Sequence, residues 1–333
     1  MIVFSDVHLR EESADVVLGE VLPGLRQAAL QHGRDPGGRH EAVCLGDFFH
    51  FRYKVDARIQ NLVADELRAW AEADIHLRVL PGNHDQYDVA GRNALELFDE
   101  IRLVDVYTQP CVDGDGVWIP FRRSPEDILT ALQSLPRNVN LNGKLVLWMH
   151  HGVRGAWAND NIQNKEGLDP NRFSEFHAVL CGHYHKRQTI GRVSYIGSPY
   201  QTRADESGQA KGYCTWDGEN LQYLDTIWGP RFHRIELKDG EALDLSGVAP
   251  RDEVRVKTVG PGAERRAEEL GKQLAASGIE RHTVTPEVEP MEQRLDVDQS
   301  ATVEDYARAY VAEFGGELDH DRLVAVFKDL VAA

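Results

Sequence analysis

The sequence predicts an α/β fold, in which short buried strands alternate with amphipathic helices. Apolar runs of strand length recur throughout residues 1–228, and segments with helical periodicity lie between them. In addition, several of the strand-like runs end directly at polar residues. Open α/β sheets place their ligands beyond the carboxyl ends of their strands. We therefore expect one site that is built from several strand ends.

The elements of this domain can be assigned in chain order. The strand-like runs cover residues 1–5, 42–45, 76–80, 144–149, 178–181, 193–196, 213–216 and 223–228. The segments with helical periodicity cover residues 14–31, 55–73 and 124–135. Pro23 lies inside the first helix and predicts a kink or a division there. Residues 93–122 are predicted to form short strands and turns.

The character of the chain changes after about residue 240. An alternating strand at 253–259, a polar helix at 263–276 and a strand-like run at 281–289 predict a small βαβ unit. Two amphipathic helices follow residue 300, separated by Gly315-Gly316. We therefore predict three parts, with bounds at 1–238, 239–298 and 299–333.

The net charge of −17 in 333 residues argues against DNA binding if it is taken alone, because phosphate contacts need Lys and Arg. The charge is unevenly distributed, and a subset of cations offers a local basic surface. The alternative interpretation is that these are ordinary solvated charges. The residues concerned are Arg122, Arg123, Lys186, Arg187, Arg192, Arg203, Lys211, Arg231 and Arg234.

The sequence predicts a cytoplasmic protein without disulfides or membrane spans. It has no apolar run of ~18 residues, and its first residues lack the basic and small-residue pattern of a signal peptide. The four cysteines are scattered, with no CxxC pair and no zinc-finger spacing.

Five polar segments carry the chemical prediction. They are Asp6-Val7-His8, Gly46-Asp47, Gly82-Asn83-His84-Asp85, His150-His151 and Gly182-His183-Tyr184-His185. In an extended chain, residues i and i+2 point to the same side, so the two residues of each D-x-H or H-x-H pair are expected to converge. Each segment alone is weak, because such residues often form turns, caps or structural histidines. Their combination, each following an apolar run, predicts a metal centre.

The donors in these segments are oxygen and imidazole, without thiolate. This set suits Mn²⁺, Fe or Zn²⁺, and Mn²⁺ most naturally because carboxylates contribute. The carboxylate of Asp47 has two oxygens and can bridge two cations. Asn83 and His84 are adjacent and are expected to point apart, one toward a metal and the other toward a substrate.

The order D-x-H, GD, GNHD, strand-terminal His and GHxH resembles the calcineurin-like metallophosphoesterase superfamily over residues 1–200. That resemblance implies a four-layer α/β/β/α sandwich with a small C-terminal α/β cap domain and terminal helices. Within the superfamily, the chain is most similar to SbcD-type DNA exonuclease subunits, whether cellular or from phage. This narrower likeness rests on His50 after Asp47, on Gly197-Ser198-Pro199-Tyr200-Gln201 with Glu206 and Lys211-Gly212, and on Pro230-Arg231-Phe232-His233.

The resemblance also implies a role for each residue of the site. Asp6, His8, Asp47 and His185 would hold a first metal ion, and Asp47, Asn83, His150 and His183 a second. The choice of His150 over His151 rests on the alignment of these motifs. His84 would be the general acid, with Asp85 to orient it and His50 to position the DNA backbone. The cofactor is then a pair of Mn²⁺ ions, with Mg²⁺, Fe or Zn²⁺ as alternatives.

The function that the resemblance implies is a metal-dependent DNA exonuclease or endonuclease subunit in DNA repair or recombination. The chain has no GxxxxGK[ST] loop, and the resemblance implies an SbcC-type coiled-coil ATPase as partner, together with homodimerisation. The three parts would then be a catalytic domain, a DNA-capping domain and a helical segment. That segment either binds the partner or packs on the chain's own body. A small-molecule phosphodiesterase or phosphatase is the alternative, and a scaffold that has lost its metal ligands fits less well because every ligand position is filled.

Overall fold

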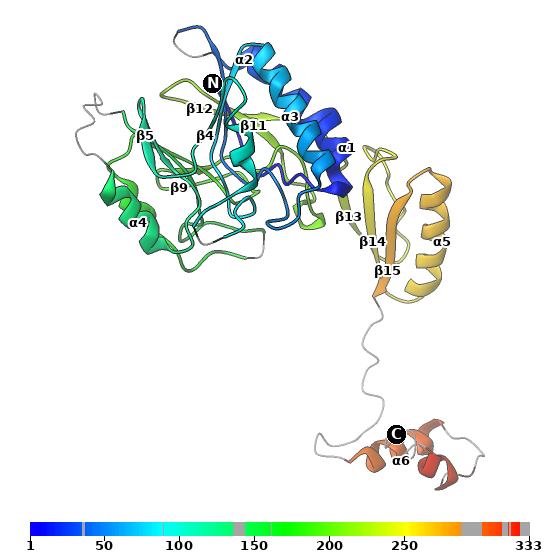
Figure 1. Cartoon of the computed structure of the whole chain (residues 1–333). Coiled ribbons are helices and arrows are strands. Elements are labelled where there is room, and N and C mark those ends of the chain that lie inside the picture. The colour runs from blue at the N-terminus through cyan, green and yellow to red at the C-terminus, as the bar shows by residue number, and fades with distance from the viewer. Residues whose placement is uncertain are drawn as a thin grey trace. The chain divides into compact units, whose positions relative to one another are not determined.

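The computed structural model describes residues 1–34, 37–88, 90–135, 144–160, 162–287, 302–314, 319 and 321–326 (Figure 1). The chain divides into two compact units. The first comprises Met1–Arg234, Leu245–Arg255 and Leu274–His282, and the second comprises Ile235–Asp244, Val256–Gln273 and Thr283–Ala333. The domain boundary expected at residue 238 stays a prediction, and the one at 298 lies outside the described residues.

The first unit contains two six-stranded sheets. The first sheet has the order β12-β11-β1-β2-β3-β4. Strands β1 to β4 run parallel, and β11 and β12 extend the sheet as an antiparallel hairpin. The strand bounds are β1 Ile2–Phe4, β2 His40–Cys44, β3 Ile75–Val79, β4 Val104–Val106, β11 Gly212–Trp216 and β12 Leu221–Asp225.

The second sheet has the order β5-β6-β7-β8-β10-β9. Its four central strands are parallel, and β5 and β9 pair antiparallel at the edges. The bounds are β5 Cys111–Asp113, β6 Gly116–Ile119, β7 Val146–His150, β8 Ala178–Gly182, β9 Gln188–Ile190 and β10 Val193–Tyr195. Parallel strands of this kind are covered on both faces, which explains why they are almost wholly apolar.

Four layers result from the two-residue alternation of side chains along each strand. In β1, Ile2 and Phe4 pack in the core that contains Leu25 and Trp70 of the helices. Val3, on the opposite face, packs in a separate core between the two sheets, with Trp148 and Leu180. A third core places Ile128 of a helix against the outer face of the second sheet. The first unit therefore has the four-layer α/β/β/α sandwich that the family resemblance implies.

Helices form the two outer layers of this sandwich (Figure 1). The helices α1 (Ala14–Val16), α2 (Leu22–His32) and α3 (Ala57–Glu72) cover the first sheet, and α4 (Pro125–Ser134) lies on the other side. The division predicted at Pro23 lies upstream of it, as a π-helical segment at Val17–Val21. Pro23 lies just beyond this segment in a helical run that continues from Ala14 to His32, and because proline has no N–H it cannot donate a helical hydrogen bond there.

One predicted strand is displaced in the structure. The apolar pattern predicts a strand at 223–228, whereas β12 spans Leu221–Asp225. A tight turn sets the register, because the Asp217 carboxylate accepts hydrogen bonds from the backbone N–H groups of Glu219 and Asn220. Trp216 consequently pairs with Leu221, and pairing begins earlier than hydrophobicity suggests.

The described residues after Pro230 contain a three-stranded sheet of order β13-β14-β15, together with helical segments. The elements are β13 Phe232–Leu237, β14 Glu253–Val259, α5 Ala263–Ala276, β15 Arg281–Glu287 and α6 Val303–Phe314. In the terminal segment, Ala307 and Val311 of α6 pack with Leu323 and Val324. The Gly315-Gly316 pair, which separates the two predicted helices, lies outside the described residues. Within the residues described, no helix is long and apolar enough to cross a membrane.

Candidate metal centre

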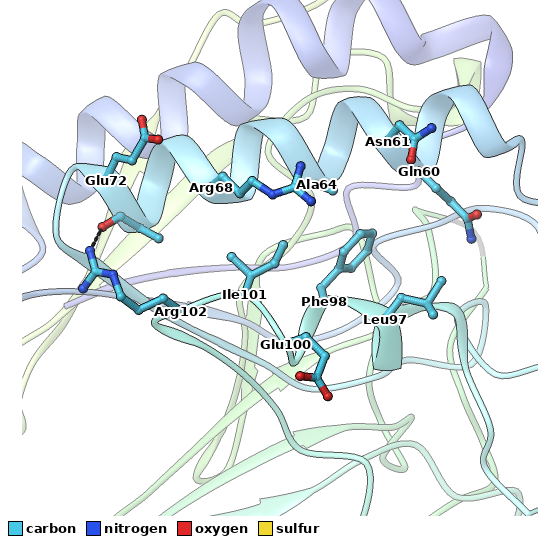
Figure 2. A pocket seen from close by; sticks show the side chains of 11 residues that line it. Gln60, Asn61, Ala64, Arg68, Glu72, Leu97, Phe98, Glu100, Ile101 and Arg102 are labelled. Carbon is cyan, nitrogen blue, oxygen red and sulfur yellow. Dashed lines mark hydrogen bonds between the residues drawn. The ribbon is translucent and has the colours of Figure 1, made fainter.

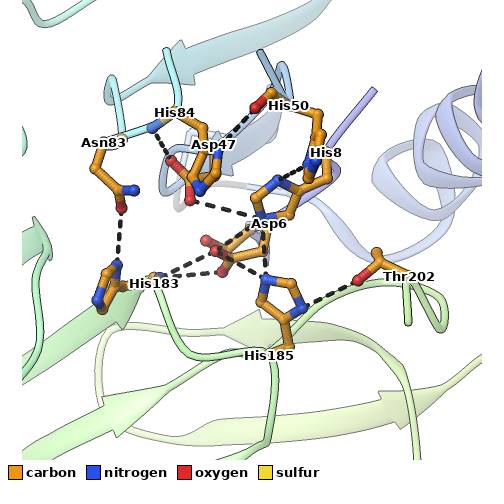
Figure 3. Close-up of polar contacts among 12 residues, drawn as sticks. Asp6, His8, Asp47, His50, Asn83, His84, His183, His185 and Thr202 are labelled. Atoms are coloured by element: carbon orange, nitrogen blue, oxygen red, sulfur yellow. Dashed lines mark hydrogen bonds and ion pairs between the residues drawn. The ribbon is translucent and has the colours of Figure 1, made fainter. Parts of the chain in front are cut away.

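The candidate site lies where loops leave the carboxyl ends of strands from both sheets. Asp6 and His8 follow β1, and Asp47 follows β2. These two loops stay hydrogen-bonded beyond the strands, since the Asp6 and His8 N–H groups donate to the Gly46 and Asp47 carbonyls, each at 2.9 Å. Asn83 and His84 follow β3, His150 ends β7, and His183 and His185 follow β8. The structure thus brings all of the predicted donor segments together. Figure 3 shows those that carry Asp6, His8, Asp47, Asn83, His183 and His185.

Glycines make this close approach of the loops possible. A methyl group at Gly182 would lie 2.2 Å from both the Leu45 carbonyl oxygen and the Ser5 hydroxyl oxygen. A methyl group at Gly82 would lie 2.2 Å from Asp47 Oδ1. Both distances are far below contact distance and involve buried, fixed atoms. The glycines of the GNHD and GHxH motifs are therefore needed for space at the junction of the loops.

Four of the donor residues have left-handed backbone conformations. The φ angles of Asp6, His8, Asp47 and His183 are +57°, +49°, +52° and +94°. Only a few per cent of non-glycine residues adopt such values, and they occur preferentially at functional sites. Asp6 and His8 do converge, as expected, but the expected cause, an extended chain, is wrong. They converge because the chain turns at both residues.

The first donor group consists of Asp6, His8 and His185. The Nε2 atoms of His8 and His185 lie 2.9 Å apart, and each lies 4.0 Å from Asp6 Oδ1. Burial, reinforced by His185, holds the pKa of His8 well below its usual value. Two buried imidazole nitrogens and a carboxylate that converge on one point fit a divalent cation.

The second donor group consists of Asp47, His150 and His183, with the side-chain oxygen of Asn83 between the two imidazoles. Asn83 Oδ1 lies 3.1 Å from His150 Nε2 and 2.8 Å from His183 Nδ1. Burial and the neighbouring His150 lower the pKa of His183 to about 3. His183 and His185 therefore serve different groups, rather than the single point expected from their H-x-H spacing.

Asp47 joins the two groups. Its Oδ2 lies 3.6 Å from His8 Nε2 and 3.4 Å from His150 Nε2. Its Oδ1 accepts a hydrogen bond of 2.8 Å from the His84 backbone N–H. Burial raises the pKa of Asp47, but His150 and His8 outweigh burial and leave the pKa below its usual value. The carboxylate is therefore ionised and lies between both sets of imidazoles, as a bridging ligand must.

The two groups are supported by different outer partners. His185 Nδ1 donates to Glu206 Oε1 at 2.5 Å, and Glu206 in turn forms a buried ion pair of 3.0 Å with Lys211. His150 Nδ1 instead donates to the Leu45 carbonyl oxygen at 2.6 Å. Each hydrogen bond fixes the ring and leaves Nε2 free to face the site. In the sequence, Glu206 and Lys211 belong to the motif on which the family resemblance rests, but nothing there predicts that Glu206 holds His185.

His84 lies beside the first group. Its Nδ1 donates to the His50 carbonyl oxygen at 2.6 Å, so its Nε2 is not used in fixing the ring. Its ring stacks on His50 at 5.3 Å and meets His8 edge-on at 4.8 Å. His50 Nδ1 lies 3.1 Å from His8 Nδ1. Burial, with the nearby Arg10, lowers the pKa of His50 to about 4.

Asp85 has a different place from the one expected. Its buried carboxylate accepts hydrogen bonds from the backbone N–H groups of Phe48, Phe49 and Gly82, at 3.3, 2.9 and 2.8 Å. Burial, with the charge of Asp47, raises its pKa to about 7. The His84 ring is oriented by the His50 carbonyl, so Asp85 acts on His84 only by tying the two loops together.

The structure also separates His150 from its neighbour. His151 Nδ1 donates to the Gly152 carbonyl oxygen, and the ring stacks on Phe121 at 5.9 Å. Its Nε2 is buried without a hydrogen-bond partner among the described residues. His150, and not His151, thus belongs to the donor group.

Several cations of the suggested basic surface are paired with acids. Lys186 pairs with Asp160 at 2.5 Å, Arg187 with Asp225, and Arg203 with Asp205 at 3.5 Å. Lys211 is buried against Glu206. For these four residues the interpretation as a basic surface is wrong.

A hollow of about 540 Å³ lies away from the donors, between α3 and residues 97–102 (Figure 2). Phe98 and Ile101 lie along it, with Arg68 and Arg102 nearby. None of the proposed metal donors lines it.

Comparisons with known proteins identify relatives of this chain. It is 24% identical to exonuclease subunit 1 of Enterobacteria phage T4 over 259 residues, which is 72% of this chain and 74% of the relative. It is 24% identical to the SbcD subunit of the nuclease SbcCD from Staphylococcus epidermidis over 233 residues, 61% of this chain and 62% of that relative. A solved structure, the Pseudomonas putida nuclease MPE, aligns with a TM-score of 0.31 and 16% identity, over 59% of this chain and 72% of that one. Finally, the family model described as calcineurin-like phosphoesterase matches residues 1–187, and the chain belongs to that family.

Proposed function

We propose that this chain is the metal-dependent nuclease subunit of a DNA exonuclease and hydrolyses phosphodiester bonds. Two relatives over most of the chain are named as nuclease or exonuclease subunits, which supports the choice of DNA over a small phosphoester. The proposed ligands are Asp6, His8, Asp47 and His185 for a first ion, and Asp47, Asn83, His150 and His183 for a second. Mn²⁺ is the proposed metal, because carboxylate and imidazole donors are mixed.

The observation that carries the proposal is the position of His84 beside the first donor group and the shared Asp47. Its Nδ1 is engaged by the His50 carbonyl, which fixes the ring and assigns a proton to that nitrogen. Its Nε2 is then the atom that can deliver a second proton to a leaving oxygen. A group placed in this way suits a phosphodiester, whose alkoxide is a poor leaving group, and typically contributes ~10²–10⁴-fold.

The reaction is the attack of water on phosphorus, with cleavage of the bond from phosphorus to the leaving oxygen. When bound, a pair of divalent ions would lower the pKa of a bound water molecule and would neutralise negative charge on the phosphoryl group. The protein's own contribution is to hold the imidazoles by Glu206 and by Leu45, and to keep Asp47 ionised. His84 protonates the leaving oxygen and recovers its proton from solvent.

The wider assembly follows from the same proposal. The chain contains no GxxxxGK[ST] loop, so we propose a coiled-coil ATPase of the SbcC type as partner, with the terminal helices at 299–333 as its binding segment. We further propose that residues 1–238 are the catalytic domain and 239–298 a DNA-capping domain. The protein would act as a homodimer in the cytoplasm, in DNA repair or recombination.

The test is Mn²⁺-dependent degradation of linear duplex and single-stranded DNA, with cyclic nucleotides and phosphomonoesters as competing substrates. His84→Ala is expected to lower DNA hydrolysis by ~10²–10⁴-fold while two ions still bind. His151→Gln is the matched control, since His151 is a buried neighbouring histidine outside the donor groups, and it should keep its activity. Faster turnover of a cyclic nucleotide than of DNA would overturn the assignment of the substrate.

A further inference from the structure

The segment directly after His50 is unusual for this chain. Phe51, Arg52, Tyr53 and Lys54 form what we call the aromatic–cationic loop, and all four side chains are exposed. Tyr53 is 80% exposed and Phe51 47%. Exposed aromatic rings are stabilised when a ligand covers them and removes their apolar surface from water. A surface that alternates such rings with cations therefore suits a ligand that has flat rings and negative charges.

The loop continues a row of rings that starts at His84. His84 stacks on His50, and the Phe51 ring meets the His50 ring edge-on at 4.7 Å. The row therefore leads outward from the candidate general acid to the protein surface.

A hollow of about 400 Å³ lies next to the loop and is lined by Arg52, Tyr53 and Tyr87. Tyr87 follows His84 by three residues and is 39% exposed. Two tyrosines, each on a loop that also carries a histidine beside the donor groups, thus share one hollow.

The hollow is lined by two arginines, Arg52 and Arg92, and by one acid, Glu96, although the whole chain carries −17. Among the described residues, Arg52 and Lys54 make no hydrogen bond or ion pair. The acid of this hollow is engaged, because Glu96 pairs with Arg92 at 2.9 Å. Lys54 lines a second hollow with Glu11, Glu12 and Asp56, where Asp56 caps α3 through two backbone N–H groups and Glu12 pairs with Arg10 at 3.8 Å. The two cations are therefore free to meet phosphates.

We propose that the aromatic–cationic loop and Tyr87 bind an unpaired DNA strand, with bases stacked on Tyr53 and Tyr87 and phosphates against Arg52 and Lys54. This inference rests on the proposed nuclease function and adds a preference to it. Bases of a blunt duplex are stacked inside the helix and cannot reach the tyrosines. The surface thus selects single-stranded or frayed ends.

The experiment measures binding of a labelled oligothymidylate by fluorescence anisotropy, with a blunt duplex of equal length as comparison. All proteins carry His84→Ala to prevent cleavage. Tyr53→Ala and Tyr87→Ala are each expected to weaken single-strand binding roughly 10- to 100-fold, the loss of stacking for one base, and duplex binding less. Tyr53→Phe keeps the ring and should bind like the parent. The double variant R52Q/K54Q should lower the salt slope by ~1.4, because each cation releases ~0.7 counterion from a single strand.

An alternative occupant of this surface is a second copy of the chain, which would bury any exposed apolar side chain here. Leu97→Ala is the control, because it removes apolar surface from the hollow without removing an aromatic ring. Leu97 lines the same hollow and is 65% exposed, but it has no ring. Unchanged single-strand affinity for Leu97→Ala supports the proposal. The proposal is overturned if Tyr53→Ala and Tyr87→Ala bind the oligomer like the parent, or if they lower self-association in sedimentation without affecting DNA affinity. Failure of the proposed function shows separately, as an absence of Mn²⁺-dependent hydrolysis of linear DNA by the unmodified protein.

Discussion

The two donor groups share Asp47 but differ in charge and in support. The first group (Asp6, His8, His185) has a carboxylate of its own, and its His185 is held by the buried Glu206–Lys211 pair. The second group (Asn83, His150, His183) has only neutral donors of its own, and its His150 is held by a backbone carbonyl. Because a carboxylate attracts a divalent cation far more strongly than an amide oxygen does in a buried site, we expect the first group to bind its ion more tightly.

The largest effect is expected for Asp47→Asn, because Asp47 is the only donor common to both groups. The substitution removes the shared charge between His8 and His150 and should weaken both binding steps. Hydrolysis of DNA should fall by at least ~10³-fold, or ~4 kcal/mol in transition-state stabilisation. Metal content and single-turnover rates provide the measurement. Loss of only one ion would show that Asp47 does not bridge.

The next prediction tests the asymmetry itself. Asp6→Asn should weaken the tighter of two binding steps in calorimetry by roughly 10²- to 10³-fold, as expected when one charge is removed from a buried set. Asn83→Ala should weaken only the other step. If both substitutions affected the same step, the division into two groups would be wrong.

Asn83→Asp provides the reverse substitution. It gives the second group a carboxylate at the position of the amide oxygen, which lies 3.1 Å from His150 and 2.8 Å from His183. The weaker step should become tighter, so that the two affinities approach each other. An unchanged weaker step would mean that charge does not set the difference.

A smaller effect is expected from the outer support of the first group. Glu206→Gln keeps the shape of the side chain but removes the charge that faces His185 Nδ1, and it should weaken the tighter step by ~10–100-fold. The weaker step should not change. Equal weakening of both steps would indicate a general loss of structure.

That variant also leaves Lys211 buried without its partner, which is expected to cost ~3–5 kcal/mol in the free energy of unfolding. The double variant E206Q/K211M removes both charges and should recover most of the stability, measured by denaturant unfolding. It should not recover the metal affinity. This pair of variants separates the positioning of His185 from folding.

The location of the donor groups could be predicted from the sequence, because apolar runs end directly at Asp47, His150 and Gly182 and strand ends are where such sheets carry sites. The four layers depend on the family resemblance, since periodicity alone does not say which sheets stack. The displaced strand β12 shows the limit of hydrophobicity, because turn hydrogen bonds at Asp217 fixed its register.

The fine geometry of the site could not be predicted, for two physical reasons. Left-handed conformations at Asp6 and His8 are imposed by the surrounding loops and leave no pattern in the sequence. The supports of the rings come from distant or backbone groups: Glu206 is 21 residues from His185, and a carbonyl at His50 orients His84. The family resemblance implied that Asp85 orients His84, whereas the structure gives that contact to the backbone carbonyl of His50.

The last prediction concerns the pH dependence of the two binding steps. Burial lowers the pKa of His150, but the adjacent Asp47 carboxylate outweighs burial and raises the pKa to about 9. His150 thus carries a proton in the ion-free protein at neutral pH, and that proton must leave before Nε2 can bind a cation.

Affinity for the weaker step should rise about tenfold per pH unit as pH increases toward 9 and then level off. His8, with its lowered pKa, has no proton to release at the tighter step. Calorimetry in buffers of different ionisation enthalpy should therefore detect proton release from His150 in the weaker step. Release of that proton in the tighter step would place His150 in the high-affinity group and reverse the comparison.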